Sequence, residues 1–115
     1  MIATVTLNPA LDKILFVPRL RVGRPIRLDS AMVLPGGKGV NIAIMLKNLG
    51  QDVLALGLVG GFVGETIEEK LQSQRISIAF KHIDGLTRTN IILTEPNGRH
   101  TEVPASRHQL LQTDF

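Results

Sequence analysis

A glycine-rich stretch, LPGGKGVNIAIMLKNLG at positions 34–50, has the residue types of a ligand-binding loop. Backbone amides in such loops can hold the phosphates of a nucleotide. A Walker-type loop, however, needs a glycine where Met32 stands and a Ser or Thr where Gly39 stands. The dinucleotide fingerprint needs a third glycine where Ile42 stands. The stretch therefore fits neither nucleotide template.

Two interpretations of this loop remain open on the residues alone. Glycines let a backbone approach a ligand closely, and the free amides at a helix N-terminus favour oxygens or negative charge. Asn41, in the expected first helical turn, can both donate and accept hydrogen bonds. The alternative is that the glycines only let a helix and a strand pack closely. The Gly-Gly-Lys-Gly cluster with a nearby Asn favours the ligand-binding interpretation modestly.

Three further residues have side chains suited to a phosphorylated polyol. Asp12 could accept hydrogen bonds from hydroxyls, although an Asp after a turn is more often a cap or an Asx-turn residue. Arg88 could bind a phosphate through its planar donor fork, and Arg27 has the same capability, although most loop arginines are only solvated.

The three histidines lack the spacing of a zinc site, and the chain has no cysteine. The sequence therefore predicts no metal site.

Charge and composition narrow the class of partner. Residues 1–50 hold seven Lys/Arg against two Asp, while residues 51–115 hold six against eight acidic residues, so the first part favours an anionic partner. The basic residues are dispersed, and the chain has only four aromatic residues, all Phe. Both features argue against nucleic acid as the partner. The longest apolar run, residues 53–63, contains three glycines and is too short to span a membrane. No secretory signal opens the chain, so a cytoplasmic location is expected.

The expected elements indicate an α/β protein. Residues 2–7, 14–17, 26–34, 53–59 and 76–83 have strand patterns, and helices are expected from about residue 38 to Gly50 and over residues 65–74. The order strand, helix, strand, helix, strand predicts a parallel sheet. Residues 89–94 and 100–103 flank an Asn-Gly pair that predicts a hairpin. At 115 residues the chain is short for a complete doubly wound domain, which usually needs about 150 to 300.

Three motifs in register resemble one known family. They are TLNPALD at positions 6–12, GGKGVNIA at positions 36–43, and TRTN at positions 87–90 ahead of the hairpin. Together they are similar to the N-terminal part of the ribokinase-like (PfkB-type) carbohydrate kinases. The branch with 1-phosphofructokinase, tagatose-6-phosphate kinase and the minor 6-phosphofructokinase is the most similar. The resemblance implies the N-terminal portion of a ribokinase-like α/β fold over residues 1–115: a mostly parallel sheet with flanking helices, plus the strands of a small β-sheet lid.

The resemblance also implies roles for individual residues. Asp12 would bind sugar hydroxyls, while Gly36, Gly37 and Lys38 would line the sugar site. Asn41 would hydrogen-bond the sugar and Arg88 would hold its existing phosphate, with Arg27 assisting from a lid strand. The lid strands, within about residues 13–34, would close over the sugar and exclude water, and in this family they often form a dimer contact.

One part of the family pattern has no counterpart here. The catalytic base and the ATP site of these kinases lie in a Gly-Ala-Gly-Asp-type segment near the C-terminus, and residues 1–115 contain none. The resemblance thus implies that the chain is the sugar-binding portion of an ATP- and Mg²⁺-dependent kinase, either a truncated gene product or a fragment of a longer chain. On its own, the chain is expected to be inactive and not to bind ATP. Fructose 1-phosphate, fructose 6-phosphate and tagatose 6-phosphate are the candidate substrates. The alternative is a non-catalytic remnant that binds sugar phosphate or associates through its lid strands.

Overall fold

The computed structural model describes residues 1–105 of the chain. Each predicted strand and helix is present there, with some shifts in the bounds. In chain order the elements are β1 (Ile2–Thr6), β2 (Ala10–Phe16), β3 (Ser30–Gly36), α1 (Lys38–Asn48), β4 (Val53–Val59), α2 (Gly61–Ser73), β5 (Ser77–His82), β6 (Arg88–Thr94) and β7 (His100–Val103). Neither helix of this described part is long and apolar enough to cross a membrane.

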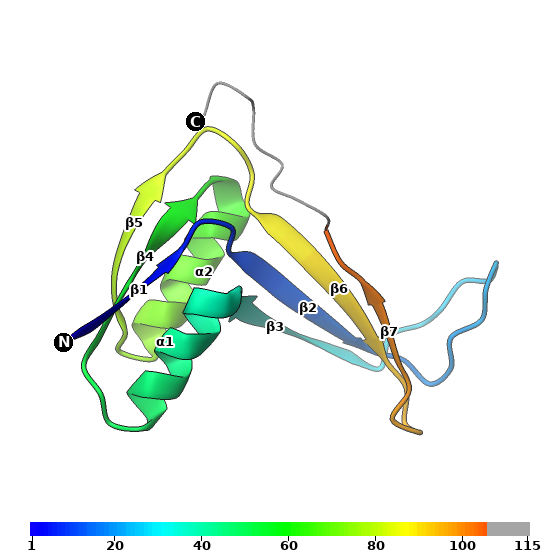
Figure 1. Ribbon diagram of the computed structural model, residues 1–115. Coiled ribbons are helices and arrows are strands. Elements are labelled where there is room, and N and C mark those ends of the chain that lie inside the picture. The colour runs from blue at the N-terminus through cyan, green and yellow to red at the C-terminus, as the bar shows by residue number, and fades with distance from the viewer. Residues whose placement is uncertain (106–115) are drawn as a thin grey trace.

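A three-stranded parallel sheet forms one layer of the molecule, which confirms the expected α/β class. β4 lies in the centre and pairs in parallel with β1 on one side and β5 on the other. Helices α1 and α2 are the crossovers that precede and follow β4, and Figure 1 shows them packed beside this sheet. A strand–helix–strand unit forms because a parallel neighbour can be reached only by a long connection across one face.

The hydrophobic core lies between this sheet and the two helices. α1 contributes the fully buried Val40 and Ala43 at helical spacing, and α2 contributes Ile67 and Leu71 four residues apart. On β4 the alternate residues Val53 and Ala55 meet them, and Leu11, Ile76 and several half-buried neighbours complete the cluster. Both helices therefore cover the same face of the parallel sheet.

The opposite face of the parallel sheet carries apolar residues that no described element covers. On β4 it presents Leu54, Leu56 and Leu58, which are only half-buried although β4 is the central strand. On β1 it presents Val5, whose side chain is 64% exposed. Parallel sheets are ordinarily covered on both faces, so this face is suited to contact with further polypeptide.

A second, four-stranded sheet extends away from the first, in the order β3, β2, β6, β7. β2 pairs antiparallel with β3 and parallel with β6, while β6 and β7 form the antiparallel hairpin that the Asn-Gly pair predicts. Figure 1 shows this sheet extending from the helices toward two loops at its far end, the β2–β3 connection and the β6–β7 turn. It contains the residues that the family resemblance assigns to a lid.

Several bounds differ from the sequence predictions. The strand expected at residues 26–34 occupies Ser30–Gly36, because pairing with β2 begins where Ser30 meets Phe16 and continues until Gly36 meets Ala10. The strand expected at 14–17 begins earlier, at Ala10, for the same reason. Helix α2 starts at Gly61, four residues before the expected position, after a turn that gives Gly61 a φ of +67°.

Candidate functional site

Asp12 and Gly36 meet where β2 begins and β3 ends. The antiparallel register places Asp12 opposite Leu34 and Ala10 opposite Gly36. A Cβ atom on Gly36 would lie 2.6 Å from Oδ2 of Asp12 and 3.0 Å from its Cγ. The carboxylate of Asp12 thus occupies the space that any side chain at position 36 would fill. Because Asp12 is only half-buried, its carboxylate remains accessible to a ligand.

Gly37 and Gly39 fit the alternative interpretation of the loop, close packing of helix against strand. Gly37 precedes α1 with a φ of +105°, and a Cβ there would lie 2.9 Å from Cγ2 of Thr6. A Cβ on Gly39 would overlap Oγ1 of Thr6 and lie 2.8 Å from the carbonyl oxygen of Val5. The first turn of α1 therefore rests directly on the end of β1. The three glycines thus differ: Gly36 leaves room for the Asp12 carboxylate, while Gly37 and Gly39 allow close packing of α1 on β1.

The N-terminus of α1 opens beside this loop. No side chain caps it, and its first turn contains no acidic residue. Lys38 and Asn41 both lie in that turn, and both are exposed. The helix dipole and the uncapped amides favour negative charge at this point, and the ammonium group of Lys38 adds to the effect. The arrangement suits a phosphate or an oxygen-rich ligand.

Arg88 approaches the same region from the start of β6, opposite Ala10. Its Nη2 donates to the carbonyl oxygen of Asn8 at 3.2 Å, and its Nη1 donates to that of Ala105 at 3.2 Å. Its Nε is buried without a hydrogen-bond partner, as is Oδ1 of Asn8. A buried guanidinium nitrogen without an acceptor is costly, so this point of the site is suited to an anionic oxygen.

Asn90 also lies in the candidate site, although its sequence position alone assigned it no role. The parallel register places it opposite Asp12, and its Nδ2 donates to Oδ1 of Asp12 at 3.0 Å. A pocket of about 190 Å³ opens beside the pair, and it is lined by Asp12, Asn90, Ile91, Ile92, Glu102 and Pro104. The TRTN motif could have indicated Asn90, but its contact with Asp12 spans 78 positions and follows only from the strand register.

Arg27 is not brought to this group within the chain. It is exposed in the connection between β2 and β3, three residues before Ser30, rather than on a strand as predicted. Because Ser30 pairs with Phe16 at the far end of the sheet, Arg27 lies at the opposite end of β3 from Gly36. Its assignment to the substrate site stays a prediction.

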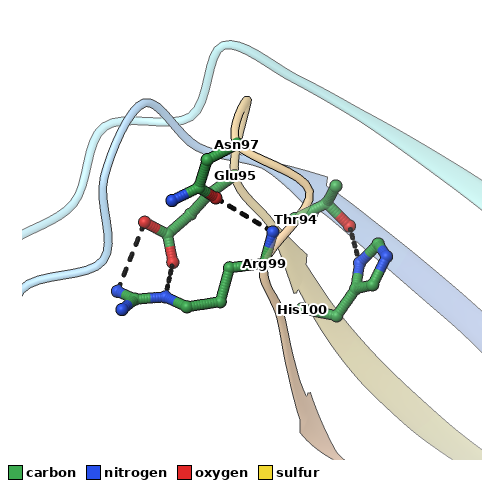
Figure 2. A network of polar contacts seen from close by, with 5 residues as sticks. All are labelled: Thr94, Glu95, Asn97, Arg99 and His100. Carbon is green, nitrogen blue, oxygen red and sulfur yellow. Dashed lines mark hydrogen bonds and ion pairs between the residues drawn. The ribbon is translucent and has the colours of Figure 1, made fainter.

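The far end of the four-stranded sheet holds a separate polar network, shown in Figure 2. Arg99 Nε donates to Oε1 of Glu95 at 2.7 Å, and the backbone amide of Arg99 donates to Oδ1 of Asn97 at 2.9 Å. Oγ1 of Thr94 lies 3.2 Å from Nδ1 of His100. The hydrogen bond from Arg99 holds the pKa of Glu95 below its ordinary value of 4.5, against the opposing effect of burial. This network stabilises the β6–β7 turn and lies far from Asp12.

The two histidines that the structure describes are exposed and have polar neighbours. Nε2 of His82 lies 2.8 Å from Oε1 of Glu68, and His100 contacts Thr94. His108 lies outside the described residues. Within residues 1–105, no three His, Asp or Glu side chains are grouped closely enough to hold a metal ion.

Comparison with known proteins places this geometry in a family. A family profile described as pfkB family carbohydrate kinase matches residues 6–113. The 1-phosphofructokinase of Bacillus subtilis is 39% identical over 115 residues, which is 100% of this chain and 37% of that protein. The tagatose-6-phosphate kinase of Staphylococcus epidermidis is 38% identical over 103 residues, which is 90% of this chain and 33% of that protein.

A solved structure shares the fold of the chain. The phosphofructokinase-2 from Escherichia coli in complex with fructose-6-phosphate superposes with a TM-score of 0.90 and 26% identity, covering 99% of this chain and 38% of that one. This chain therefore spans only a little over a third of the length of the relatives that it matches. Since the profile nevertheless matches almost all of its residues, the chain belongs to the pfkB family of carbohydrate kinases.

Proposed function

We propose that this chain is the N-terminal, sugar-binding portion of an ATP-dependent sugar-phosphate kinase. The activity proposed for that kinase is the one of 1-phosphofructokinase, which phosphorylates fructose 1-phosphate to fructose 1,6-bisphosphate. The observation that carries the proposal is the convergence of Asp12, Gly36 and Arg88 from β2, β3 and β6. This arrangement combines a carboxylate acceptor for hydroxyls with a guanidinium group for a phosphate on the same molecule.

In this proposal each group binds one part of the ligand. Asp12 accepts hydrogen bonds from sugar hydroxyls, and Gly36 leaves the room that this carboxylate occupies. The backbone of Gly37, with Lys38 and Asn41 in the first turn of α1, lines the sugar, and Arg88 holds its existing phosphate. The buried Nε of Arg88 supports this role, since an anionic oxygen would supply the acceptor that it lacks.

The four-stranded sheet would act as the lid of the site. The lid strands expected within about residues 13–34 correspond to most of β2 and β3, and β6 and β7 extend the same sheet. Because Asp12 lies in the sheet and the first turn of α1 lies outside it, a movement of the sheet toward α1 would enclose a bound sugar. Closure would exclude water from the reacting hydroxyl.

ATP, when bound to the whole enzyme, would supply the phosphoryl group that the sugar hydroxyl accepts. The described residues offer no group of three metal-ligating side chains for Mg²⁺, and the glycine-rich loop matches neither nucleotide template. We therefore assign ATP and Mg²⁺ to sequence outside this chain, and the chain alone is expected neither to bind nor to hydrolyse ATP. Micromolar binding of ATP in calorimetry would contradict this assignment.

The uncovered face of the parallel sheet supports the view that more polypeptide belongs to the functional protein. Leu54, Leu56 and Leu58 on the central strand β4 are only half-buried, which a complete α/β layer would not leave. A portion that carries the ATP site and packs on this face would account for the exposure.

Isothermal titration calorimetry tests the sugar-binding role directly. The chain is titrated with fructose 1-phosphate, fructose 6-phosphate and tagatose 6-phosphate, and at least one is expected to bind. Arg88→Ala is expected to weaken binding by about tenfold or more, because it removes charge-assisted hydrogen bonds to the phosphate. Arg24→Ala, in the exposed β2–β3 connection, removes an equal charge and should leave affinity unchanged. Absence of binding to all three ligands would refute the proposal.

A second candidate function is a non-catalytic module that binds sugar phosphate or associates with other copies through its lid strands. The observation that favours it is the outer edge of β3, which pairs only with β2 among the described strands. An unpaired edge can add a strand from another chain. Binding of sugar phosphate by a protein that remains without kinase activity in its full natural length would favour this candidate.

A further inference from the structure

The two carboxylate oxygens of Asp12 have different neighbours. Oδ1 of Asp12 accepts from Nδ2 of Asn90 at 3.0 Å. Oδ2 lies against Gly36, where an added Cβ would come within 2.6 Å of Oδ2 and 3.3 Å of Oδ1. The hydrogen bond from β6 therefore holds the carboxylate in the space that the absence of a side chain at Gly36 provides.

The orientation of the Asn90 amide is itself determined by a neighbour. Oδ1 of Asn90 accepts from the backbone amide of Ala105 at 2.9 Å, just beyond the end of β7. Because that oxygen faces an N–H group, the NH₂ end of the amide must face Asp12. The chain of contacts runs from the backbone after β7, through Asn90, to the carboxylate on β2. Asn90 and Asp12 are both half-buried, so this chain is partly shielded from water.

We propose that Asn90 is a positioning residue for sugar recognition, an inference that rests on the proposed function. By holding Oδ1, Asn90 keeps the Asp12 carboxylate in one orientation beside the pocket that both residues line, ready to accept from a hydroxyl of the sugar phosphate. Without Asn90, the Asp12 side chain could rotate about χ1. Fixing that side chain would then cost entropy when the ligand binds, which would weaken binding. Asn90 acts on the ligand only through Asp12. Because the acceptor is a charged carboxylate, the hydrogen bond from Asn90 is stronger than one between neutral groups.

The first test measures the orientation of Asp12 without any ligand. Three-bond NMR couplings report the χ1 rotamer of Asp12 in the unmodified chain, where one rotamer is expected. Asn90→Ala is expected to give averaged couplings, and so is Asn90→Asp, which keeps an acceptor for Ala105 but loses the donor to Asp12. Thr89→Ala is the matched control, because Thr89 pairs with Leu11 and lies on the opposite face of β6. A single unchanged Asp12 rotamer in both Asn90 variants would overturn the proposal.

The second test is a double-mutant cycle on sugar-phosphate affinity. Asn90→Ala is expected to raise the Kd about tenfold in the unmodified background, and to change it less than about twofold when Asp12 is already Ala. Equal effects in the two backgrounds would overturn the positioning role, since a merely structural residue would weaken binding in both. If the unmodified chain bound no sugar phosphate, the proposed function would fail, while the Asp12 rotamer would still decide whether Asn90 orients the carboxylate.

Discussion

Gly36 is the residue on which the candidate sugar site depends most directly. Gly37 and Gly39 lie against Thr6 and the β1 backbone, so their lack of a side chain serves packing between α1 and β1. Gly36 instead lies against the side chain of Asp12, and its lack of a side chain leaves room for a carboxylate. Adjacent glycines of one motif thus meet different physical requirements.

Gly36→Ala is expected to displace the Asp12 carboxylate, because the added Cβ would fall 2.6 Å from Oδ2. We expect the affinity for sugar phosphate to fall by about tenfold or more, as on losing a hydrogen bond to a charged group. The free energy of unfolding should change by only about 1 kcal/mol. Calorimetry and urea denaturation measure the two effects.

Gly23→Ala is the matched control for that substitution. Gly23 has a φ of +77°, and a Cβ added there would have no atom within 4 Å, so alanine is strained but clashes with nothing. It should lower the free energy of unfolding by about 1 kcal/mol and leave affinity unchanged. Unchanged affinity in Gly36→Ala itself would show that ligand binding does not depend on the position of the Asp12 carboxylate.

At the scale of elements, the β6–β7 hairpin holds a carboxylate whose charge contributes to stability. Glu95 is 6% exposed and accepts a hydrogen bond from Arg99, which holds its pKa in the folded chain below the ordinary value of 4.5. A carboxyl group whose pKa is lower when folded stabilises the fold above its unfolded pKa. That stabilisation is lost as the pH falls through the lowered folded pKa.

Glu95→Gln is therefore expected to flatten the pH dependence of stability below about pH 4.5. Urea denaturation midpoints between about pH 3 and pH 6 measure the effect. Glu69→Gln, on the exposed side of α2, is the control and should keep the pH dependence of the unmodified chain. The prediction is wrong if the two variants give the same curve.

Most elements could be predicted from the sequence, because their signals are local. The apolar run of β4, the apolar spacing of α1 and the Asn-Gly pair of the hairpin each act within about ten residues. The contact between Asp12 and Asn90 and the distance of Arg27 from Gly36 depend instead on strand register. Register is set by pairing between distant segments, so no local pattern of residues contains it.

At the scale of the whole molecule, the uncovered face of the parallel sheet determines how the isolated chain behaves. Val5 on β1 is 64% exposed, and Leu7, just after that strand, is 63% exposed. β1 is also an edge strand in the described part of the chain, where it pairs only with β4. Apolar surface beside a strand edge promotes association between copies.

Val5→Lys is expected to reduce self-association of the chain, because it places a charge on this apolar surface. Sedimentation velocity over a range of protein concentrations measures the effect. Val22→Lys is the matched control, since Val22 is 97% exposed in the β2–β3 connection and the substitution adds the same charge away from the sheet. Identical sedimentation of the two variants would contradict a role for the uncovered face.

The register that joins Asp12 to Asn90 also has a consequence for biosynthesis. Every group proposed to bind the sugar phosphate lies within the first 90 residues, and Ala105 completes the contacts around them. A ribosome adds about 5 to 20 residues per second, and N-terminal units can fold before the rest is made. Under the proposed function, a nascent chain would bind sugar phosphate as soon as these residues have folded. The metabolite would then stabilise the early folding unit by mass action.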